Sequence, residues 1–292
     1  MRDVIWPLVL IVSLASPVAA QVGFFGYVGV MCDHDDPFDD SGLTDYRAEV
    51  AGFTNANHVC LPADPTAWAD RIRTADAAFR PILSIEGAFD FEGAGPDGAS
   101  GQATWPLLLQ AIRDSGVDPG RLILHLVDEP TLRGIRMDWV SLAAARVRAD
   151  LPQAEVMVIE ACRIEGPPPI PPEVTLWGFD CYTIPDPGAE PYFMAFLNAA
   201  LWSLHDGQRL VLIMDANHTP IHAANGLAPD AMADVARAYA ALALATPQVA
   251  GVIGYTWPGG VDNHEERGVR DLPPAVIAAH KEVGRLLLGL AP

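Results

Sequence analysis

Two adjacent carboxylates end a strongly apolar run of this chain. In LHLVDEP (Leu124–Pro130), Asp128 and Glu129 precede a proline, which cannot continue a central strand. Burying acidic side chains beside a hydrophobic core costs on the order of several kcal/mol. Two neighbouring carboxyl groups also resist sharing two negative charges, which raises the pKa of one of them. A carboxyl group that keeps its proton can act as a general acid, and we expect Glu129 to be that group.

Both carboxylates can serve one site only if the local backbone is irregular. Successive residues of a strand point to opposite sides, so a regular strand would separate Asp128 from Glu129. A strand end or a bulge brings both side chains to the same face. The alternative is that one of the two merely caps the next helix.

Other apolar runs also end in polar or aromatic residues. These are the groups that glycoside hydrolysis requires, because one acid protonates the leaving oxygen, a second carboxylate supports the oxocarbenium-like centre, and aromatic rings stack on the sugar. Asp215 is a candidate second carboxylate, with sugar binding or a structural role as alternatives. The last run offers Tyr255 and Trp257, of which we prefer Trp257 as the stacking ring. The candidates for substrate contact are Trp257, Tyr182, Glu160, Asp180, Glu86, His125, Asp33 and His218.

Eight apolar runs alternate with helical patterns along the chain, which predicts a single (β/α)8 TIM barrel. In such a barrel the carboxyl ends of all strands meet at one face, so the scattered polar residues would converge there. The segment RIEGPPPIPPE (Arg163–Glu173) is too rich in proline for a regular helix and predicts an irregular connection between strands 5 and 6. A doubly wound open sheet is the alternative, but no GxGxxG follows the first run. The eight runs are Phe24–Cys32, Asn57–Ala63, Pro81–Ala88, Arg121–Glu129, Glu155–Cys162, Val174–Tyr182, Arg209–Ala216 and Ala250–Trp257.

The sequence LVDEP resembles the Asn-Glu-Pro signature of the clan A glycoside hydrolases, whose acid/base glutamate falls on Glu129. It departs from that clan in two places: Asp128 replaces the asparagine, and LIMDANH around Asp215 lacks the glutamate nucleophile. The Asp-Glu-Pro form is more similar to family 123 and related hexosaminidases. That resemblance implies that Glu129 acts as acid/base while Asp128 orients the 2-acetamido group of the substrate, which serves as the internal nucleophile. Trp257 likewise resembles the sugar-stacking platform of many barrel glycosidases.

The sequence therefore predicts a glycoside hydrolase that acts on an extracellular or cell-envelope oligosaccharide or polysaccharide. Its second carboxylate would be either Asp128, by substrate assistance, or Asp215, directly. The missing glutamate near Asp215 also fits a different class of protein, a catalytically silent barrel that binds polysaccharide. Glycan binding without turnover, insensitive to Glu129→Gln, would distinguish that class.

The N-terminal residues 1–20 predict a secretory signal peptide, which leaves residues 21–292 as the barrel. A charged start leads into an apolar run from about Val4 to Leu14, and Val18-Ala19-Ala20 resembles a cleavage site. The run is short for a membrane anchor, and prolines interrupt it, so we expect no stable membrane span after cleavage. The expected location is secreted or periplasmic. An even number of cysteines fits disulfides there, and the strand order favours Cys32–Cys60 and Cys162–Cys181.

The net charge of −19 disfavours binding to nucleic acid or to anionic membranes. We expect a carbohydrate partner and no cofactor. No catalytic metal site is expected either, because the chain has no CxxC and no HxH in the first run. The acidic loop Cys32–Gly42 remains open between a calcium site, using Asp33, Asp35, Asp36, Asp39 and Asp40, and a solvated loop.

Overall fold

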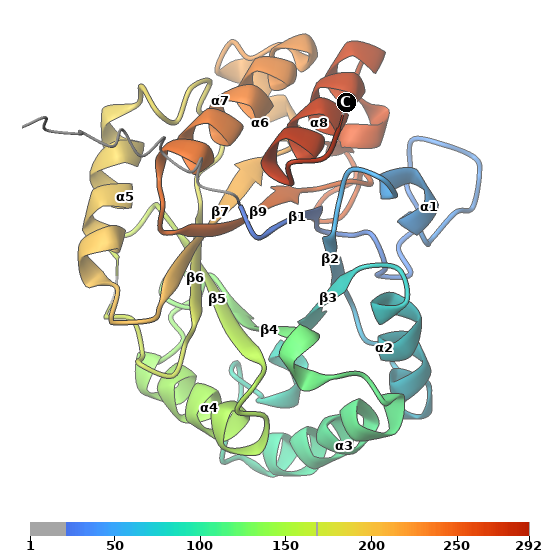
Figure 1. Ribbon diagram of the computed structural model, residues 1–292, viewed down its shortest axis with the longest axis vertical. Coiled ribbons are helices and arrows are strands. Elements are labelled where there is room, and N and C mark those ends of the chain that lie inside the picture. The colour runs from blue at the N-terminus through green and yellow to red at the C-terminus, as the bar shows by residue number, and fades with distance from the viewer. Residues whose placement is uncertain (1–21, 168, 292) are drawn as a thin grey trace, which may run out of the picture.

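The structure is a computed structural model that describes residues 22–167 and 169–291. The signal peptide expected at residues 1–20 lies outside the described residues. Eight parallel strands form a nearly closed barrel in the order β1-β9-β7-β6-β5-β4-β3-β2, and helices surround it (Figure 1). The predicted (β/α)8 barrel is thereby confirmed, and each of the eight predicted runs overlaps one strand. The strands are β1 (Phe24–Tyr27), β2 (Ala56–Val59), β3 (Arg80–Ser84), β4 (Ile123–Asp128), β5 (Glu155–Ala161), β6 (Leu176–Asp180), β7 (Arg209–Asp215) and β9 (Val249–Tyr255).

Six long helices cover the outside of the barrel: α2 (Trp68–Asp76), α3 (Ala99–Ser115), α4 (Met137–Asp150), α5 (Pro191–Ser203), α7 (Met232–Ala245) and α8 (Pro274–Leu287). Helix α1 (Arg47–Val50) and helix α6 (Pro220–Ala224) are short. The proline-rich connection from β5 to β6 has no helix in its described residues, 162–167 and 169–175, as predicted. Strands β8 (Asn217–His218) and β10 (Arg267–Gly268) pair antiparallel in a separate two-stranded sheet. Short 3-10 turns lie at Pro65–Ala67, Glu86–Ala88, Pro119–Arg121, Pro229–Ala231 and Val269–Asp271.

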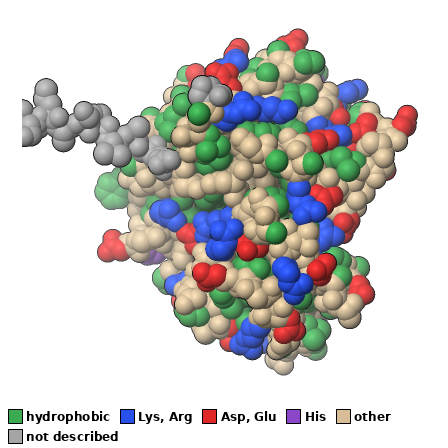
Figure 2. Space-filling model, turned by 45° about the vertical axis from the view of Figure 1, so that its right-hand side comes forward, with side chains coloured by type: hydrophobic (Ala, Val, Ile, Leu, Met, Phe, Trp, Pro, Cys, Tyr) green, Lys and Arg blue, Asp and Glu red, His purple; other side chains and the backbone are tan. Residues whose placement is uncertain are grey.

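The strands are apolar on both faces because both faces are buried. One set of side chains packs inside the barrel, among them Phe24, Ile82 and Ile123. The other set, including Phe25 and Leu124, packs between the strands and the helices. On the face shown in Figure 2, acidic and basic side chains are interspersed over the surface. In the part of the chain that the structure describes, no helix is long and apolar enough to cross a membrane.

The seam between β1 and β2 is closed partly by side chains. The amide oxygens of Asn55 and Asn57 accept hydrogen bonds from the backbone N–H groups of Phe25 (2.9 Å) and Tyr27 (3.0 Å). Gly26 permits this close approach, because a Cβ there would lie 1.4 Å from the carbonyl oxygen of Ala56. The two strands therefore meet at a distance that any side chain at position 26 would prevent.

Two disulfides tie neighbouring strand ends together. Cys32 pairs with Cys60 beyond β1 and β2, and Cys162 pairs with Cys181 beyond β5 and β6. Both pairs follow the predicted strand order. They lie at the carboxyl ends of the strands, the face at which the candidate residues converge.

Gly26→Ala is expected to reduce the free energy of unfolding by roughly 3 kcal/mol or more, because the added methyl group overpacks the β1–β2 seam. The matched control is Gly87→Ala, since a Cβ at exposed Gly87 meets no atom within 4 Å. Urea unfolding followed by circular dichroism measures both changes. Equal stability of the two variants would contradict this account of the seam.

Candidate active site

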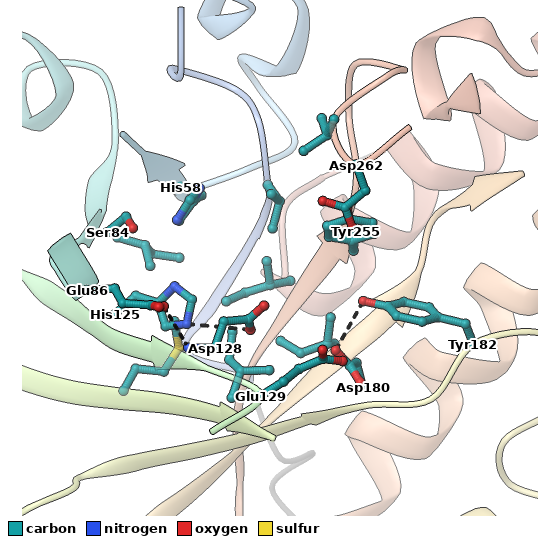
Figure 3. Close-up of a pocket in the computed structure, with 17 residues that line it drawn as sticks. His58, Ser84, Glu86, His125, Asp128, Glu129, Asp180, Tyr182, Tyr255 and Asp262 are labelled. Carbon is teal, nitrogen blue, oxygen red and sulfur yellow. Dashed lines mark hydrogen bonds and ion pairs between the residues drawn. The ribbon is translucent and has the colours of Figure 1, made fainter. Parts of the chain in front are cut away.

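A cavity of about 260 Å³ opens at the carboxyl ends of the strands. We call it the mouth cavity (Figure 3). Its floor consists of aliphatic side chains from inside the barrel, such as Ile82 and Ile213. Its polar lining comes from five strands and the loops that follow them: His58, Ser84, Glu86, His125, Asp128, Glu129, Asp180, Tyr182, Tyr255 and Asp262.

An extra residue in β4 turns Asp128 into the mouth cavity. His125 pairs with Met157 of β5, but the next pair is Val127 with Val158, so Leu126 is unmatched. Leu126 and Val127 both pack in the outer core, whereas strict alternation would have sent Val127 inward and Asp128 outward. Glu129 then adopts a left-handed backbone with φ +44°. As a result, both adjacent carboxylates line the same cavity.

Crowding and burial favour the protonated forms of these acids. Burial, together with the charge of Glu86, raises the pKa of Asp128 to about 7. The side chain of Asp128 is 49% exposed, but this exposed part belongs to the lining of the cavity rather than to the outer surface. Burial and the neighbouring carboxylates Glu129 and Asp128 raise the pKa of Asp180 to about 8. Burial also raises the pKa of Glu129, with Asp128 as the next contributor.

The turn after β4 is held by one ion-pair network and one buried glutamate. Arg133 pairs with Glu86 at 2.5 Å and donates to the carbonyl oxygen of Asp128 at 2.9 Å. Glu86 in turn accepts from the backbone N–H of Asp128 at 3.2 Å. Glu160 is fully buried and accepts from the backbone N–H of Thr131 at 3.0 Å. Glu160 therefore braces the turn from outside the mouth cavity, which differs from the substrate contact expected from the sequence.

Two neutral imidazoles, His58 and His125, line the side of the mouth cavity that is away from Tyr182 (Figure 3). Burial lowers the pKa of His58 to about 3 and that of His125 to about 4. Their ring centroids are 5.7 Å apart. Nε2 of His125 lies 3.8 Å from a carboxylate oxygen of Asp128 and has no hydrogen-bond partner among the described residues. The sequence indicated His125 but not His58, because a histidine near the end of a short strand carries no chemical signature by itself.

Asp215, the candidate second carboxylate, does not reach the mouth cavity. It is fully buried, accepts from the backbone N–H of Thr183 at 2.7 Å and pairs with Nε2 of His222 at 3.0 Å. Its side chain therefore holds the loops after β6 and β7 together. The structural alternative for Asp215 fits this placement.

Trp257 also lies outside the mouth cavity. Its ring is 2% exposed and packs edge-on against Tyr27, with centroids 5.1 Å apart, while its indole N–H donates to Glu49. Tyr255, two residues earlier, lines the cavity instead. A ring buried in this way does not face the mouth cavity, which differs from the stacking position expected for Trp257 from the sequence.

Asp33 and His218 are two further sequence candidates that do not line the mouth cavity. Asp33 forms an ion pair with Arg71 outside the mouth cavity. The ring of His218 is buried and hydrogen-bonded through Nε2 to the carbonyl oxygen of Leu227 at 2.9 Å. Besides Glu129, five of the residues predicted from the sequence do line the mouth cavity: Glu86, His125, Asp128, Asp180 and Tyr182.

One group of side chains with metal-ligand chemistry lies beside the site. Cys32, His58 and Cys60 lie within reach of a common ion, but the two sulfur atoms form a disulfide. In the acidic loop, Asp36 and Asp39 both pair with Arg270.

Asp262 lines the mouth cavity from the loop after β9. No sequence signal distinguished Asp262 from the other acids, because only the fold carries that loop over the barrel.

Comparison with known proteins yields matches at the level of the fold. No family model matches the chain, and no curated protein matches it. Among solved structures, native xylanase 10B from Thermotoga maritima has 12% identity and a TM-score of 0.56, covering 91% of this chain and 96% of that one. A GH113 β-mannanase from Alicyclobacillus acidocaldarius has 14% identity and a TM-score of 0.56, covering 91% and 98%. An Anoxybacillus α-amylase has 10% identity and a TM-score of 0.57, covering 91% and 78%. All three are glycoside hydrolases, and the likeness shows that this chain shares their barrel.

Asp215→Ala is expected to lower the free energy of unfolding by roughly 2–5 kcal/mol, because it leaves Nε2 of buried His222 and the backbone N–H of Thr183 without their partner. Asp234→Asn is the control, since the Asp234 side chain is 86% exposed and its ion pair with Arg237 contributes about 0.5 kcal/mol or less. Urea unfolding at pH 7 measures both. A small loss for Asp215→Ala, equal to that of the control, would contradict the bracing role.

Stability is expected to fall as pH rises through the titration range of Asp180. Its folded-state pKa of about 8 lies above the ordinary value of 3.8, so the folded protein binds this proton more tightly than the unfolded chain. Stability from this group is present at low pH and is lost between about pH 4 and pH 8. Asp180→Asn should therefore flatten the fall in unfolding free energy between about pH 4 and pH 8. An unchanged slope would argue against the raised pKa.

Proposed function

We propose that this protein is a retaining glycoside hydrolase that uses the 2-acetamido group of its substrate as the nucleophile. The observation that supports this most is the pair Asp128–Glu129, whose carboxylates both line the mouth cavity. A second support is the absence of a β7 carboxylate from that lining, because Asp215 is engaged elsewhere. Substrate assistance is a mechanism that needs no enzyme nucleophile.

The first step would be proton transfer from Glu129 to the glycosidic oxygen. The raised pKa of Glu129 favours the protonated form that this step requires. As the leaving group departs, the acetamido oxygen attacks the anomeric carbon and forms a cyclic oxazolinium ion. Asp128 would accept a hydrogen bond from the acetamido N–H and thereby orient the amide and stabilise its developing positive charge.

The second step would reverse the role of Glu129. Its carboxylate removes a proton from a water molecule, which attacks the anomeric carbon and opens the oxazolinium ring with net retention. The hydroxyl of Tyr182, 3.3 Å from a carboxylate oxygen of Asp180, lies across the mouth cavity from His58 (Figure 3). Asp180 and Tyr182 would bind the sugar on that side.

The place of action would be outside the cytoplasm. Two disulfides fit an oxidising compartment, and the proposed substrate class is a cell-envelope or extracellular glycan. A catalytically silent, polysaccharide-binding barrel is the second candidate. It is favoured by the same absence of a carboxylate from β7 at the mouth cavity.

Purified protein is expected to cleave 4-nitrophenyl N-acetylhexosaminides and not the matching hexosides, because only the former carry the internal nucleophile. A panel with both anomers of the glucose and galactose series measures this. Glu129→Gln should lower kcat/KM by about 10²–10⁴ on oligosaccharides, whose leaving groups need a proton. Asp128→Asn should lower it by about 10²–10³ on every substrate.

The control variant is Glu265→Gln, an exposed glutamate outside the mouth cavity. Cleavage of hexosides as fast as N-acetylhexosaminides would contradict substrate assistance. Glycan binding without turnover, unaffected by Glu129→Gln, would identify the silent barrel instead.

A further inference from the structure

Two smaller cavities adjoin the mouth cavity, and Arg163 lines both. We call them the Arg163 clefts. The first has a volume of about 180 Å³ and shares Glu129, Asp180 and Tyr182 with the mouth cavity. The second has a volume of about 200 Å³ and shares Tyr182, Tyr255 and Asp262 with it. A glycan that enters the mouth cavity can therefore extend past Glu129 into a space bordered by Arg163.

Arg163 is an available cation in otherwise acidic surroundings. Its side chain is exposed and makes no hydrogen bond or ion pair with any residue that the structure describes. Among the described residues, no lysine or arginine lines the mouth cavity itself. Arg133, the arginine that braces the turn after β4, already pairs with Glu86 and Glu92. The guanidinium of Arg163 is thus free to bind an anion.

The backbone that carries Arg163 is well anchored. Cys162, immediately before it, forms the disulfide with Cys181 and donates from its backbone N–H to the carbonyl oxygen of Asp180 at 2.9 Å. The carbonyl oxygen of Cys162 accepts a hydrogen bond from the hydroxyl of Tyr192. Only the side chain of Arg163 extends freely from this fixed point, next to the first cleft. A binding group mounted on a rigid support is held close to its productive position.

The chemistry of arginine limits the class of anion. Its planar guanidinium forms paired hydrogen bonds with a carboxylate, which a single ammonium group cannot do. The net charge of −19 would repel a densely charged polyanion. The distant part of this charge acts weakly on a single carboxylate bound to Arg163, because charges farther away than a Debye length of about 8 Å are largely screened. A sparsely charged glycan with one carboxylate near the cleaved bond meets both conditions.

We propose that Arg163 binds a carboxylate on the sugar at the leaving-group side of the cleaved bond. Resting on the proposed function, this makes the substrate a glycan in which an N-acetylhexosamine is followed by an acidic sugar. The carboxylate can belong to a uronic acid or to the lactyl ether of muramic acid. Both place one negative charge on the sugar beside the scissile oxygen. The first Arg163 cleft begins at that point, because Glu129, the proposed acid, lines it.

The test compares acidic oligosaccharides with their own carboxyl-reduced forms, which keep every linkage and lose only the charge. One probe is a hyaluronan hexasaccharide, and the other is a tetrasaccharide of alternating N-acetylglucosamine and N-acetylmuramic acid. For the probe that is cleaved, the preference is kcat/KM on the acidic form divided by kcat/KM on its carboxyl-reduced form. Arg163→Gln should lower this ratio by about tenfold or more, because a charge-assisted hydrogen bond is lost. The change should lie mainly in KM. Arg163→Lys should restore part of that ratio. Arg113→Gln, an exposed arginine of α3 away from these cavities, should leave it as in the wild type.

Binding to the Glu129→Gln background separates this inference from the proposed function. Calorimetric titration of that variant measures the affinity for the same four probes without turnover. A weaker affinity for an acidic probe after Arg163→Gln, with no cleavage by the wild type, would support the anion site and contradict the proposed enzyme. Equal kcat/KM and equal affinity for the acidic and reduced forms of both probes would overturn the inference. Loss of preference for one probe only would identify the source of the carboxylate.

Discussion

The unmatched Leu126 in β4 is the feature on which the site depends. A barrel strand buried on both faces alternates strictly, so a regular β4 would have pointed Asp128 toward the helices. The extra residue resets the alternation, and the left-handed backbone of Glu129 then turns the following carboxylate to the same side. Such a conformation is uncommon outside glycine and costs on the order of 1–3 kcal/mol, so the surroundings must hold it. Arg133, Glu86 and Glu160 supply that support through the hydrogen bonds around the turn.

The same geometry sets the electrostatics. Asp128, Glu129 and Asp180 lie close enough for each to raise the pKa of another, and none of them has an arginine or lysine partner among the described residues. The cations nearby pair with the supporting acids Glu86 and Glu92 instead. Arg133 therefore fixes the supporting acids Glu86 and Glu92, whereas burial and mutual repulsion raise the pKa values of Asp128, Glu129 and Asp180. This division suits a site in which one carboxyl group donates a proton and another stabilises a positive charge.

The barrel and its disulfides were predictable from the sequence, because buried parallel strands leave continuous apolar runs and consecutive strands are neighbours. The pair Asp128–Glu129 was also identifiable, since two acids at the end of such a run are unusual. The bulge was not, because Leu126 and Val127 are both apolar and the run looks regular. Position at a strand end was not enough to place Trp257 and Asp215. Asp215 is the last residue of β7 and Trp257 follows β9, and both side chains make protein contacts outside the mouth cavity. Asp262 and Arg163 lie on loops, and only the folded chain places them beside the strand ends.

The central claim is that Asp128 and Glu129 together process a sugar whose own acetamido group closes on the anomeric carbon. The most direct measurement is inhibition by the methyl thiazoline derived from N-acetylglucosamine, a stable mimic of that closed ring. The account predicts competitive inhibition at least about 10²-fold tighter than by N-acetylglucosamine itself, since an intermediate mimic shares the features of the transition state. It also predicts that Asp128→Asn removes most of this advantage. A thiazoline that binds no better than the free sugar, or equally well to wild type and Asp128→Asn, would contradict it.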